Sequence, residues 1–149
     1  SGRYFEYYGE DAILIGKIGA EVIRGAKNSG LICYMKHYAV SEEGDNPENI
    51  RTWLSEQALR ELYLKPFEIC VKDGNANAVM NAFNCIGAVW AGACYPLNVT
   101  ILRNEWGFRG VALTDWSYGR PYMNTEQALR GGNDVMKRLK ALRAEVAEK

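Results

Sequence analysis

The stretch ILRNEWGFRGVALTDW, residues 101–116, contains the signals that decide the fold. Its first part continues a helix predicted over residues 97–106, which Gly107 ends. Gly110 then leads into residues 111–114, a short apolar run without helical periodicity. Such a run is typical of a strand that is buried in a parallel sheet. The stretch therefore predicts one helix–strand unit of an α/β protein.

The same alternation continues on both sides of this stretch. The predicted helices are 12–27, which stops at Asn28-Ser29-Gly30, a long one that Ser55 caps and Lys72-Asp73-Gly74 ends, 97–106, 125–130 and 137–149. The predicted strands are 31–35, 78–83, 111–114 and 133–136, and residues 41–49 are expected to form a loop. The order is one helix followed by four strand–helix units, which predicts a parallel sheet.

The length limits which parallel fold is possible. The chain has 149 residues, of which 48% are hydrophobic and 24% charged, a composition typical of a globular domain. A complete (β/α)8 barrel needs ~250 residues. The prediction is therefore an α/β fold, a parallel (βα)4 half-barrel unit preceded by one helix and part of a TIM barrel. The alternative is an open flavodoxin-like sheet. Because a half-barrel leaves two strand edges unpaired, a homodimer that completes the barrel is expected.

Composition excludes several classes of partner. Eighteen basic and eighteen acidic side chains cancel, so there is no basic excess for nucleic acid. No apolar run approaches the ~20 residues of a membrane span, and no signal-peptide pattern is present. The four cysteines lack CxxC spacing and are expected to be free thiols. These features favour a cytoplasmic protein that binds neither nucleic acid nor membrane.

Cofactor and metal signatures are also missing from the sequence. It contains no GxGxxG, no GxxxxGK[ST] and no GxSxG motif, so nucleotide binding and serine hydrolysis lack support. One histidine and scattered cysteines do not make a zinc site. Neither a cofactor nor a metal is expected.

Polar and aromatic side chains gather where the predicted strands end. The first strand is followed by Lys36 and His37, and the third by Asp115 and Trp116. In parallel α/β proteins the carboxyl ends of the strands carry the site. Lysine and histidine can donate to hydroxyls, tryptophan can stack on a sugar, and a carboxylate can act on a cationic centre. These side chains indicate a polyhydroxylated ligand.

Each of these residues also has a purely structural interpretation. His37 could be a satisfied structural histidine, and Lys36 could extend its ammonium group to water. Asp115 could cap the following turn. Only their shared position at strand ends favours the functional interpretation.

Several longer motifs carry a resemblance to a known family. They are GRYFEYYGED (2–11), MKHYA (35–39), SEQALRELYLKPFE (55–68), VMNAFN (79–84), ILRNEWGFRGVALTDW (101–116) and GGNDVM (131–136). In order and spacing they resemble glycoside hydrolase family 3, in its bacterial β-glucosidase-like branch. The resemblance implies a barrel domain that cleaves β-glucosides by a retaining double displacement.

The resemblance also implies roles for individual residues. Asp115 stands at the position of the family's nucleophile, and Lys36 and His37 match its pair of sugar-binding residues. Arg3 matches another ligand of sugar hydroxyls, and Trp116 is expected to flank the aglycone side. A carbohydrate is therefore the expected ligand.

The sequence departs from the family in ways that affect activity. The loop 40–54 contains SEEGDNPEN in place of the usual pocket segment. The family's first barrel strands and its second domain, which supplies the general acid/base, are not found. Retaining hydrolysis needs two carboxyl groups ~5–5.5 Å apart, and only Asp115 is assigned. Weak or no hydrolysis by the chain alone is expected, and a structural or designed half-barrel scaffold without catalysis is the alternative.

The end of the chain is expected to form a separate unit. The resemblance covers residues 1–136, whereas residues 137–149 read as an idealised helix. That helix is either an added or redesigned cap or a natural surface helix.

Overall fold

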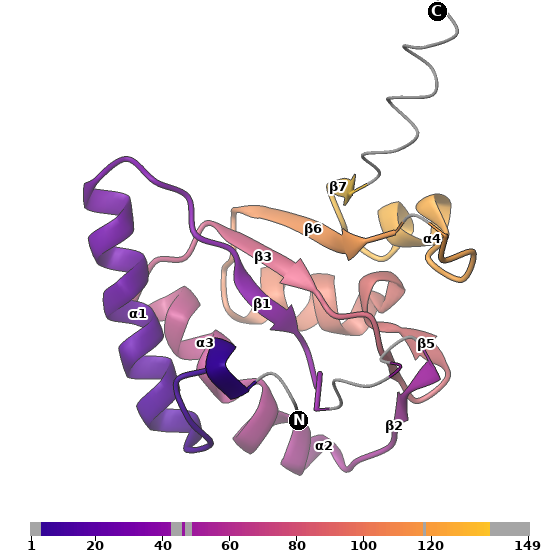
Figure 1. Ribbon diagram of the computed structural model, residues 1–149, viewed down its shortest axis with the longest axis horizontal. Coiled ribbons are helices and arrows are strands. Elements are labelled where there is room, and N and C mark those ends of the chain that lie inside the picture. The colour runs from indigo at the N-terminus through magenta and orange to yellow at the C-terminus, as the bar shows by residue number, and fades with distance from the viewer. Residues whose placement is uncertain (1–3, 43–45, 47–48, 118, 138–149) are drawn as a thin grey trace, which may run out of the picture.

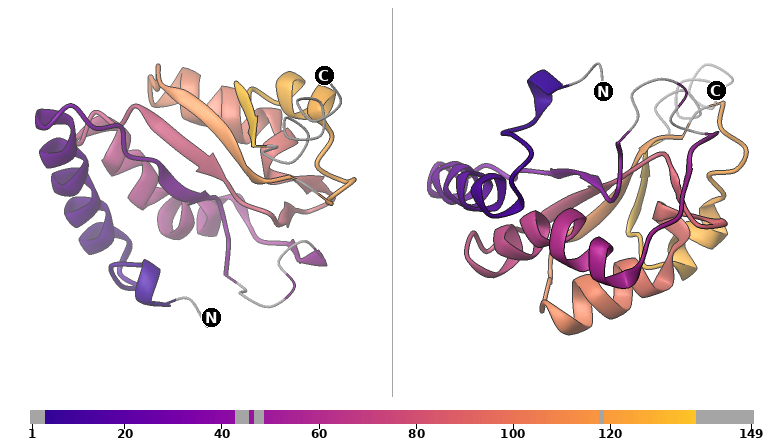
Figure 2. Two further views of the ribbon diagram at one scale, coloured as in Figure 1. Left: turned by 45° about the horizontal axis from the view of Figure 1, so that its top comes forward. Right: turned by 90° about the horizontal axis from the view of Figure 1, so that it is seen from below.

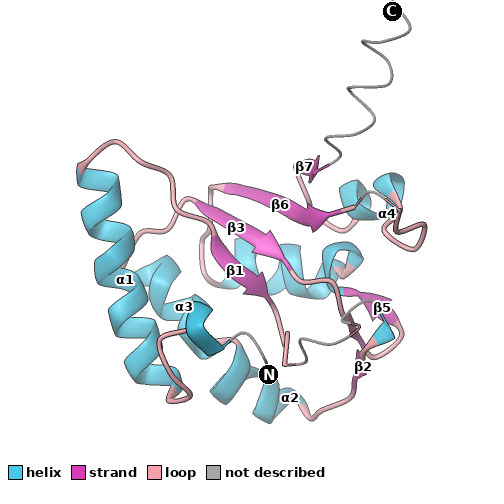
Figure 3. Cartoon of the chain, viewed as in Figure 1, coloured by secondary structure: helices cyan, strands magenta, loops and turns pink. Residues whose placement is uncertain are grey.

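The structure is a computed structural model that describes residues 4–42, 46, 49–117 and 119–137. Figure 3 shows the helices and strands of this part of the chain. Arg3, a predicted sugar-binding residue, lies outside the described residues. So do residues 138–149 of the predicted helix 137–149.

The central sheet has four parallel strands in the order β1-β3-β6-β7. They are β1 (Met35–Tyr38), β3 (Ala78–Asn81), β6 (Val111–Trp116) and β7 (Val135–Lys137). The helical segments are η1 (Tyr4–Glu6), α1 (Ala12–Asn28), α2 (Glu56–Ala58), η3 (Leu59–Tyr63), α3 (Lys65–Lys72), η4 (Ala91–Ala93), η5 (Pro96–Glu105) and α4 (Thr125–Arg130). Figure 1 shows α1 at one end of the sheet, beside α3, and α4 at the other end, near β7.

The strand order confirms the barrel-type prediction over the flavodoxin-like alternative. Each strand pairs with the one that follows it in this sheet, so the winding never reverses. Because strand–helix–strand crossovers are right-handed, the connecting helices must then share one face. A flavodoxin-like order would contain a switch point and would place helices on both faces. Figure 2 shows the connecting helices along one side of the sheet, with the other side free of them.

Side-chain caps start the helices where the sequence predicts them. The carboxylate of Asp11 accepts a hydrogen bond from the Leu14 N–H at 2.7 Å, before α1. The hydroxyl of Ser55 accepts one from the Ala58 N–H at 3.2 Å, which confirms the predicted cap, although the single long helix predicted after it is divided into α2, η3 and α3. Each cap satisfies one of the donors that a helix N-terminus leaves unpaired.

Helix α1 packs closely on α3 because small residues face the contact. A Cβ atom on Gly16 would lie 2.7 Å from Cδ1 of Ile69. A Cβ atom on Gly74, just after α3, would lie 2.9 Å from the Cα of Ala20. Both distances are too short for a side chain, so glycine is needed at these two positions for the helices to approach.

Tyr38 joins β1 to the helical layer. Its ring is fully buried and makes edge-to-face contacts with Phe67 and Trp106, at centroid distances of 5.1 and 6.2 Å. Its hydroxyl donates to the carbonyl of Leu97 at 3.0 Å. This contact positions the strand that also carries Lys36 and His37.

Three predicted segments differ from the structure. The strand predicted over 31–35 is wrong, because β1 begins only at Met35 and the apolar Leu31 and Ile32 before it are 61% and 59% exposed. The predicted loops contain a second, three-stranded sheet of β2 (Arg51–Thr52), β4 (Cys85–Ile86) and β5 (Val89–Trp90). Lys137, predicted as the start of the last helix, is instead the final residue of β7.

The four cysteines are free thiols, as predicted from their spacing. Cys70 and Cys85 are buried, whereas Cys33 and Cys94 are partly exposed. Within the described ranges, no helix combines the length and the apolar character that crossing a membrane requires.

Candidate active site

The sheet register brings His37 and Asp115 to one place. Tyr38 of β1 is level with Asn81 of β3, and Asn81 is level with Thr114 of β6. His37 therefore lies one residue before this level and Asp115 one residue after it, on the two strands that flank β3. Since strands two apart in a sheet are separated by about 9.5 Å, the two side chains can meet only by reaching across β3 from the same side.

Asp115 is held by donors on both carboxylate oxygens. Its Oδ2 lies 3.3 Å from Nε2 of His37, and its Oδ1 accepts from the Trp116 N–H at 2.6 Å. The side chain is 13% exposed. Burial alone would raise the pKa of this carboxyl group. The interactions with His37 and with the Trp116 N–H, aided by the charge of Lys137, outweigh burial and hold the pKa below its usual value. Asp115 is therefore a carboxylate at neutral pH.

His37 has a polar partner at each of its two ring nitrogens. Its side chain is only 4% exposed, and its Nδ1 lies 3.1 Å from the hydroxyl of Tyr7. Tyr7 belongs to the segment between η1 and α1, thirty residues before His37. The ring thus forms a bridge between an N-terminal segment and the end of β6.

Lys36 points its charge at a carboxylate from the same N-terminal segment. Its Nζ donates to Oε2 of Glu6, the last residue of η1, at 2.7 Å. The peptide bonds Lys36–His37 and Tyr38–Ala39 are both cis. The hydrogen bond to Glu6 ties Lys36 to the N-terminal segment, and the hydrogen bond to Tyr7 ties His37 to the same segment.

Trp116 is the remaining predicted site residue that the structure describes. Trp116 is the last residue of β6 and is partly exposed, and its carbonyl accepts from the guanidinium of Arg120 at 3.1 Å. That guanidinium lies over the ring of Phe83 at 4.4 Å from its centroid. Asn84 is buried and donates to the carbonyl of Ala39 at 3.2 Å. Phe83 and Asn84 follow β3 and thus lie at the same end of the sheet as Asp115.

Sequence reasoning missed three residues that support this cluster. Glu6 and Tyr7 stand in the motif GRYFEYYGED, from which only Arg3 was singled out. The hydroxyl of Thr114 donates to the Asp115 carbonyl at 2.8 Å and accepts from the Lys137 N–H at 3.0 Å. It therefore ties the end of β6 to β7. The motif itself was the only signal that could have identified Glu6 and Tyr7.

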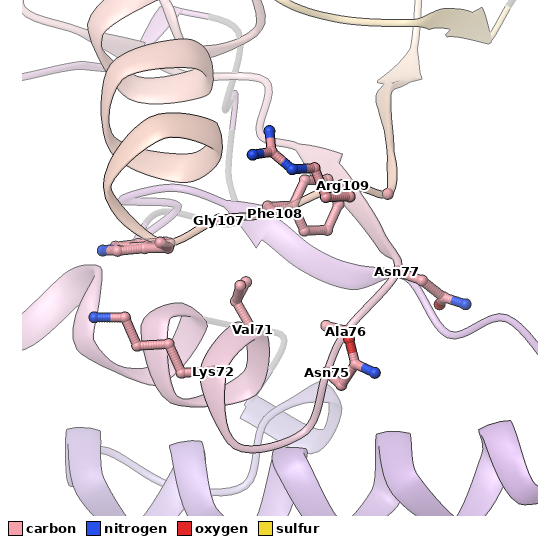
Figure 4. A pocket seen from close by; sticks show the side chains of 10 residues that line it. Val71, Lys72, Asn75, Ala76, Asn77, Gly107, Phe108 and Arg109 are labelled. Carbon is pink, nitrogen blue, oxygen red and sulfur yellow. The ribbon is translucent and has the colours of Figure 1, made fainter.

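The structure also has a cavity of about 430 Å³ far from this cluster. Residues 71–72 and 75–77, which precede β3, and residues 106–110, which precede β6, line it (Figure 4). It thus opens at the amino ends of these strands, opposite Asp115. Lys72 on its wall is paired with Glu68 at 2.6 Å. Within the described ranges, no group of three or more His, Cys, Asp or Glu side chains could hold a metal ion.

Comparison with known proteins identifies the family. The model of the glycosyl hydrolase family 3 N-terminal domain matches residues 1–143. The chain belongs to glycosyl hydrolase family 3. This confirms the resemblance found in the sequence motifs, and the matched region includes every residue of the cluster around Asp115.

Relatives and solved structures of this family agree with the match. The chain is 39% identical over 134 residues to beta-glucosidase B of Emericella nidulans, covering 90% of the chain and 16% of that protein. It is 38% identical over 135 residues to beta-glucosidase A of Butyrivibrio fibrisolvens, with the same two coverages. A beta-glucosidase structure from Paenibacillus barengoltzii superposes with a TM-score of 0.88 at 36% identity, over 98% of the chain and 18% of that protein.

A second solved structure is described with a sugar bound. Beta-glucosidase 3B of Thermotoga neapolitana, in complex with α-D-glucose, superposes with a TM-score of 0.86 at 31% identity. The superposition covers 99% of the chain and 22% of that protein. The family 3 chain described here thus spans less than a quarter of the length of these relatives.

Proposed function

We propose that this chain carries the nucleophile side of a retaining β-glucosidase site, with Asp115 as the nucleophile. The observation that carries the proposal is the carboxylate of Asp115 itself. It is largely buried, kept ionised by two donors, and located at the carboxyl end of a barrel strand. In a barrel of this kind, that end is where catalytic side chains are found.

The reaction would proceed by double displacement. An oxygen of Asp115 attacks the anomeric carbon, a bond forms between them, and the bond from that carbon to the aglycone oxygen breaks. Water then attacks the same carbon and releases Asp115 as a carboxylate, so the sugar leaves with its original configuration. The His37 and Trp116 donors would hold the carboxylate in one orientation throughout.

Lys36 would bind hydroxyls of the sugar in the same subsite. Both ring nitrogens of His37 face protein groups, so in this proposal His37 holds the carboxylate of Asp115, and the sugar contact predicted for it would require one nitrogen to leave Asp115 or Tyr7. An ammonium group has three donors, and the bond to Glu6 uses one while it orients the others. Trp116 would flank the aglycone, and Arg3 would supply a further donor. The carbohydrate ligand is a proposal drawn from the beta-glucosidases that the chain resembles.

None of the residues assigned above is a general acid, so this proposal includes no group that protonates the leaving aglycone. Because loss of general acid/base help costs about 10²–10⁴-fold, glycosides with poor leaving groups should be hydrolysed weakly or not at all. An aryl glucoside whose leaving group departs without a proton removes this requirement. Such a substrate therefore tests Asp115 separately from the acid.

Azide rescue of a nucleophile variant tests the proposal. Asp115→Ala should release no phenolate from dinitrophenyl β-glucoside without azide, and should form α-glucosyl azide when azide is added. Azide takes the place of the carboxylate at the anomeric carbon and the dinitrophenolate leaves, so the product is inverted. Asp134→Ala, which alters a carboxylate paired with Arg103 at the other end of β6, is the matched control and should form no α-glucosyl azide. Absence of the α-azide from Asp115→Ala would favour the scaffold alternative.

Assembly into a homodimer that completes the barrel stays a proposal. It is supported by the two edge strands, β1 and β7, and by the exposed apolar Leu31, Ile32 and Val135 beside or on them. Light scattering at micromolar concentration should give twice the mass of 16.7 kDa. A single monomer mass would contradict this proposal. A cytoplasmic location and the division at residue 136 likewise remain predictions.

A further inference from the structure

Each ring nitrogen of His37 faces a hydrogen-bonding partner. Nε2 faces Oδ2 of Asp115 at 3.3 Å, and Nδ1 faces the hydroxyl of Tyr7 at 3.1 Å. The ring is almost fully buried, so these two partners determine how it is oriented. No role for Tyr7 follows from the proposed function.

The chemistry of the two partners defines the tautomer of the neutral ring. A carboxylate only accepts hydrogen bonds, so Nε2 must carry the proton that faces Asp115. In a neutral imidazole the other nitrogen is then an acceptor. The Tyr7 hydroxyl can donate to it. The opposite tautomer would direct the lone pair of Nε2 at the carboxylate.

We propose that Tyr7 is a positioning residue for the nucleophile, acting through His37. This rests on the proposed role of Asp115. By donating to Nδ1, the Tyr7 hydroxyl holds the Nε2–H tautomer and the ring angle that directs this proton at Asp115. The Trp116 N–H holds the other oxygen, so the carboxylate is aligned from two sides. Tyr7 thereby couples the N-terminal segment to the end of β6.

Two neighbouring tyrosines provide a matched pair of variants. Tyr7→Phe removes the hydroxyl that faces His37 and keeps the ring. Tyr8→Phe makes the same chemical change one residue later, on a side chain that is half exposed. Among the described residues, no hydrogen bond joins Tyr8 to His37 or Asp115. A difference between the two variants therefore reports the contact with His37.

Nitrogen NMR of the ring tests the proposal without any need for activity. His37 is the only histidine of the chain, so isotopically labelled histidine gives the signals of this ring alone. We expect the Nε2–H tautomer with a hydrogen-bonded Nδ1 in the wild type and in Tyr8→Phe. In Tyr7→Phe, the Nδ1 resonance should move toward that of a free acceptor and the minor tautomer should grow. An unchanged Nδ1 resonance in Tyr7→Phe would overturn the proposal.

A second measurement covers the case in which Tyr7→Phe does not fold. Wild-type chain grown with fluorotyrosine has more acidic phenols and is expected to keep its fold, which its circular dichroism spectrum checks. A stronger donor at Tyr7 should shift the Nδ1 resonance in the direction opposite to that in Tyr7→Phe. If the resonance does not move, Tyr7 does not donate to His37 and the proposal fails.

Covalent labelling links the contact to catalysis. With an activated fluoroglucoside, the rate of labelling at Asp115 should fall about fivefold in Tyr7→Phe, the equivalent of one hydrogen bond of ~1 kcal/mol. Tyr8→Phe should label at the wild-type rate. Equal rates in Tyr7→Phe and wild type would show that Tyr7 does not position the nucleophile. Absence of labelling in the wild type would instead refute the proposed function, while the NMR result would still decide the contact.

Discussion

Nε2 of His37 on β1 lies 3.3 Å from Oδ2 of Asp115 on β6, although β3 runs between these two strands. Contact across an intervening strand requires a sheet that curves, with both side chains on the side that the helices leave free. The relationship thus joins the curvature of a barrel segment to the assembly of its site. It also keeps the carboxylate ionised.

The lowered pKa of Asp115 should make its contribution to stability depend on pH. A depressed pKa adds stability above the unfolded value of ~3.9, and this stability is lost as pH falls through the lower folded value. The difference in free energy of unfolding between wild type and Asp115→Asn should therefore shrink as pH falls from about 5 through the unfolded value and on through the lower folded value. Denaturant titrations at each pH measure it. A difference that grows toward low pH would contradict the assignment.

The same measurement in a His37→Gln background tests whether His37 is what lowers the pKa of Asp115. Burial raises the pKa of Asp115, and the interaction with His37 is the largest of those that lower it. Without His37, the pH dependence of the Asp115→Asn difference should be weaker. An equal dependence in both backgrounds would show that His37 does not stabilise the carboxylate.

Gly110 is expected to tolerate no side chain. A Cβ atom there would lie 2.1 Å from the carbonyl oxygen of Asn77, at the point where β6 begins beside β3. Because backbone must move, Gly110→Ala should lower the free energy of unfolding by about 2 kcal/mol or more. Gly25→Ala, in an open position on α1, should instead raise it by about 0.5–1 kcal/mol. Similar effects at both glycines would contradict the close approach.

The buried hydroxyl of Tyr38 should contribute measurably to stability. Tyr38→Phe leaves the carbonyl of Leu97 without this donor and should cost about 1–3 kcal/mol in free energy of unfolding. Tyr34→Phe, on a side chain that is half exposed, should change it by less than about 0.5 kcal/mol. Thermal or denaturant unfolding of both variants distinguishes them. A neutral Tyr38→Phe would mean that the hydroxyl finds no partner in the core.

The cysteines should react in an order determined by burial. Burial, with a smaller effect of Asp73, raises the pKa of the Cys70 thiol to about 11, so little of it is the reactive thiolate. Cys33 is partly exposed in the segment before β1. Iodoacetamide should therefore modify Cys33 well before Cys70, as peptide mapping over time would show. Early modification of Cys70 would contradict the packing of α3 on α1.

Local signals explain why much of the fold could be predicted. Ser55 caps α2 as its sequence position indicates, and the predicted helix 125–130 has the bounds of α4. Glycine and asparagine mark the ends of several elements, and apolar runs mark β3 and β6. These features depend only on neighbours along the chain, which a sequence displays directly.

Contacts between distant segments explain what could not be predicted. The hydrophobicity of Leu31 and Ile32 suggested a strand, but β-pairing begins only at Met35, where β3 offers a partner. The small sheet pairs β2 with β4 across more than thirty residues. Tyr7 meets His37 across thirty residues, and no local pattern marks that contact. Asp115 and His37 could be singled out because both follow apolar runs in the sequence, whereas their supporting partners could not.

Covalent trapping on Asp115 is the most direct test of the central claim. A dinitrophenyl glucoside with fluorine at the second carbon forms a long-lived glycosyl–enzyme, because the fluorine slows hydrolysis and the leaving group needs no acid. Mass spectrometry of peptides from the labelled chain should locate one fluoroglucosyl group on Asp115, and Asp115→Asn should acquire none. A label on another residue, or no label after prolonged incubation, would contradict the assignment of Asp115 as the nucleophile.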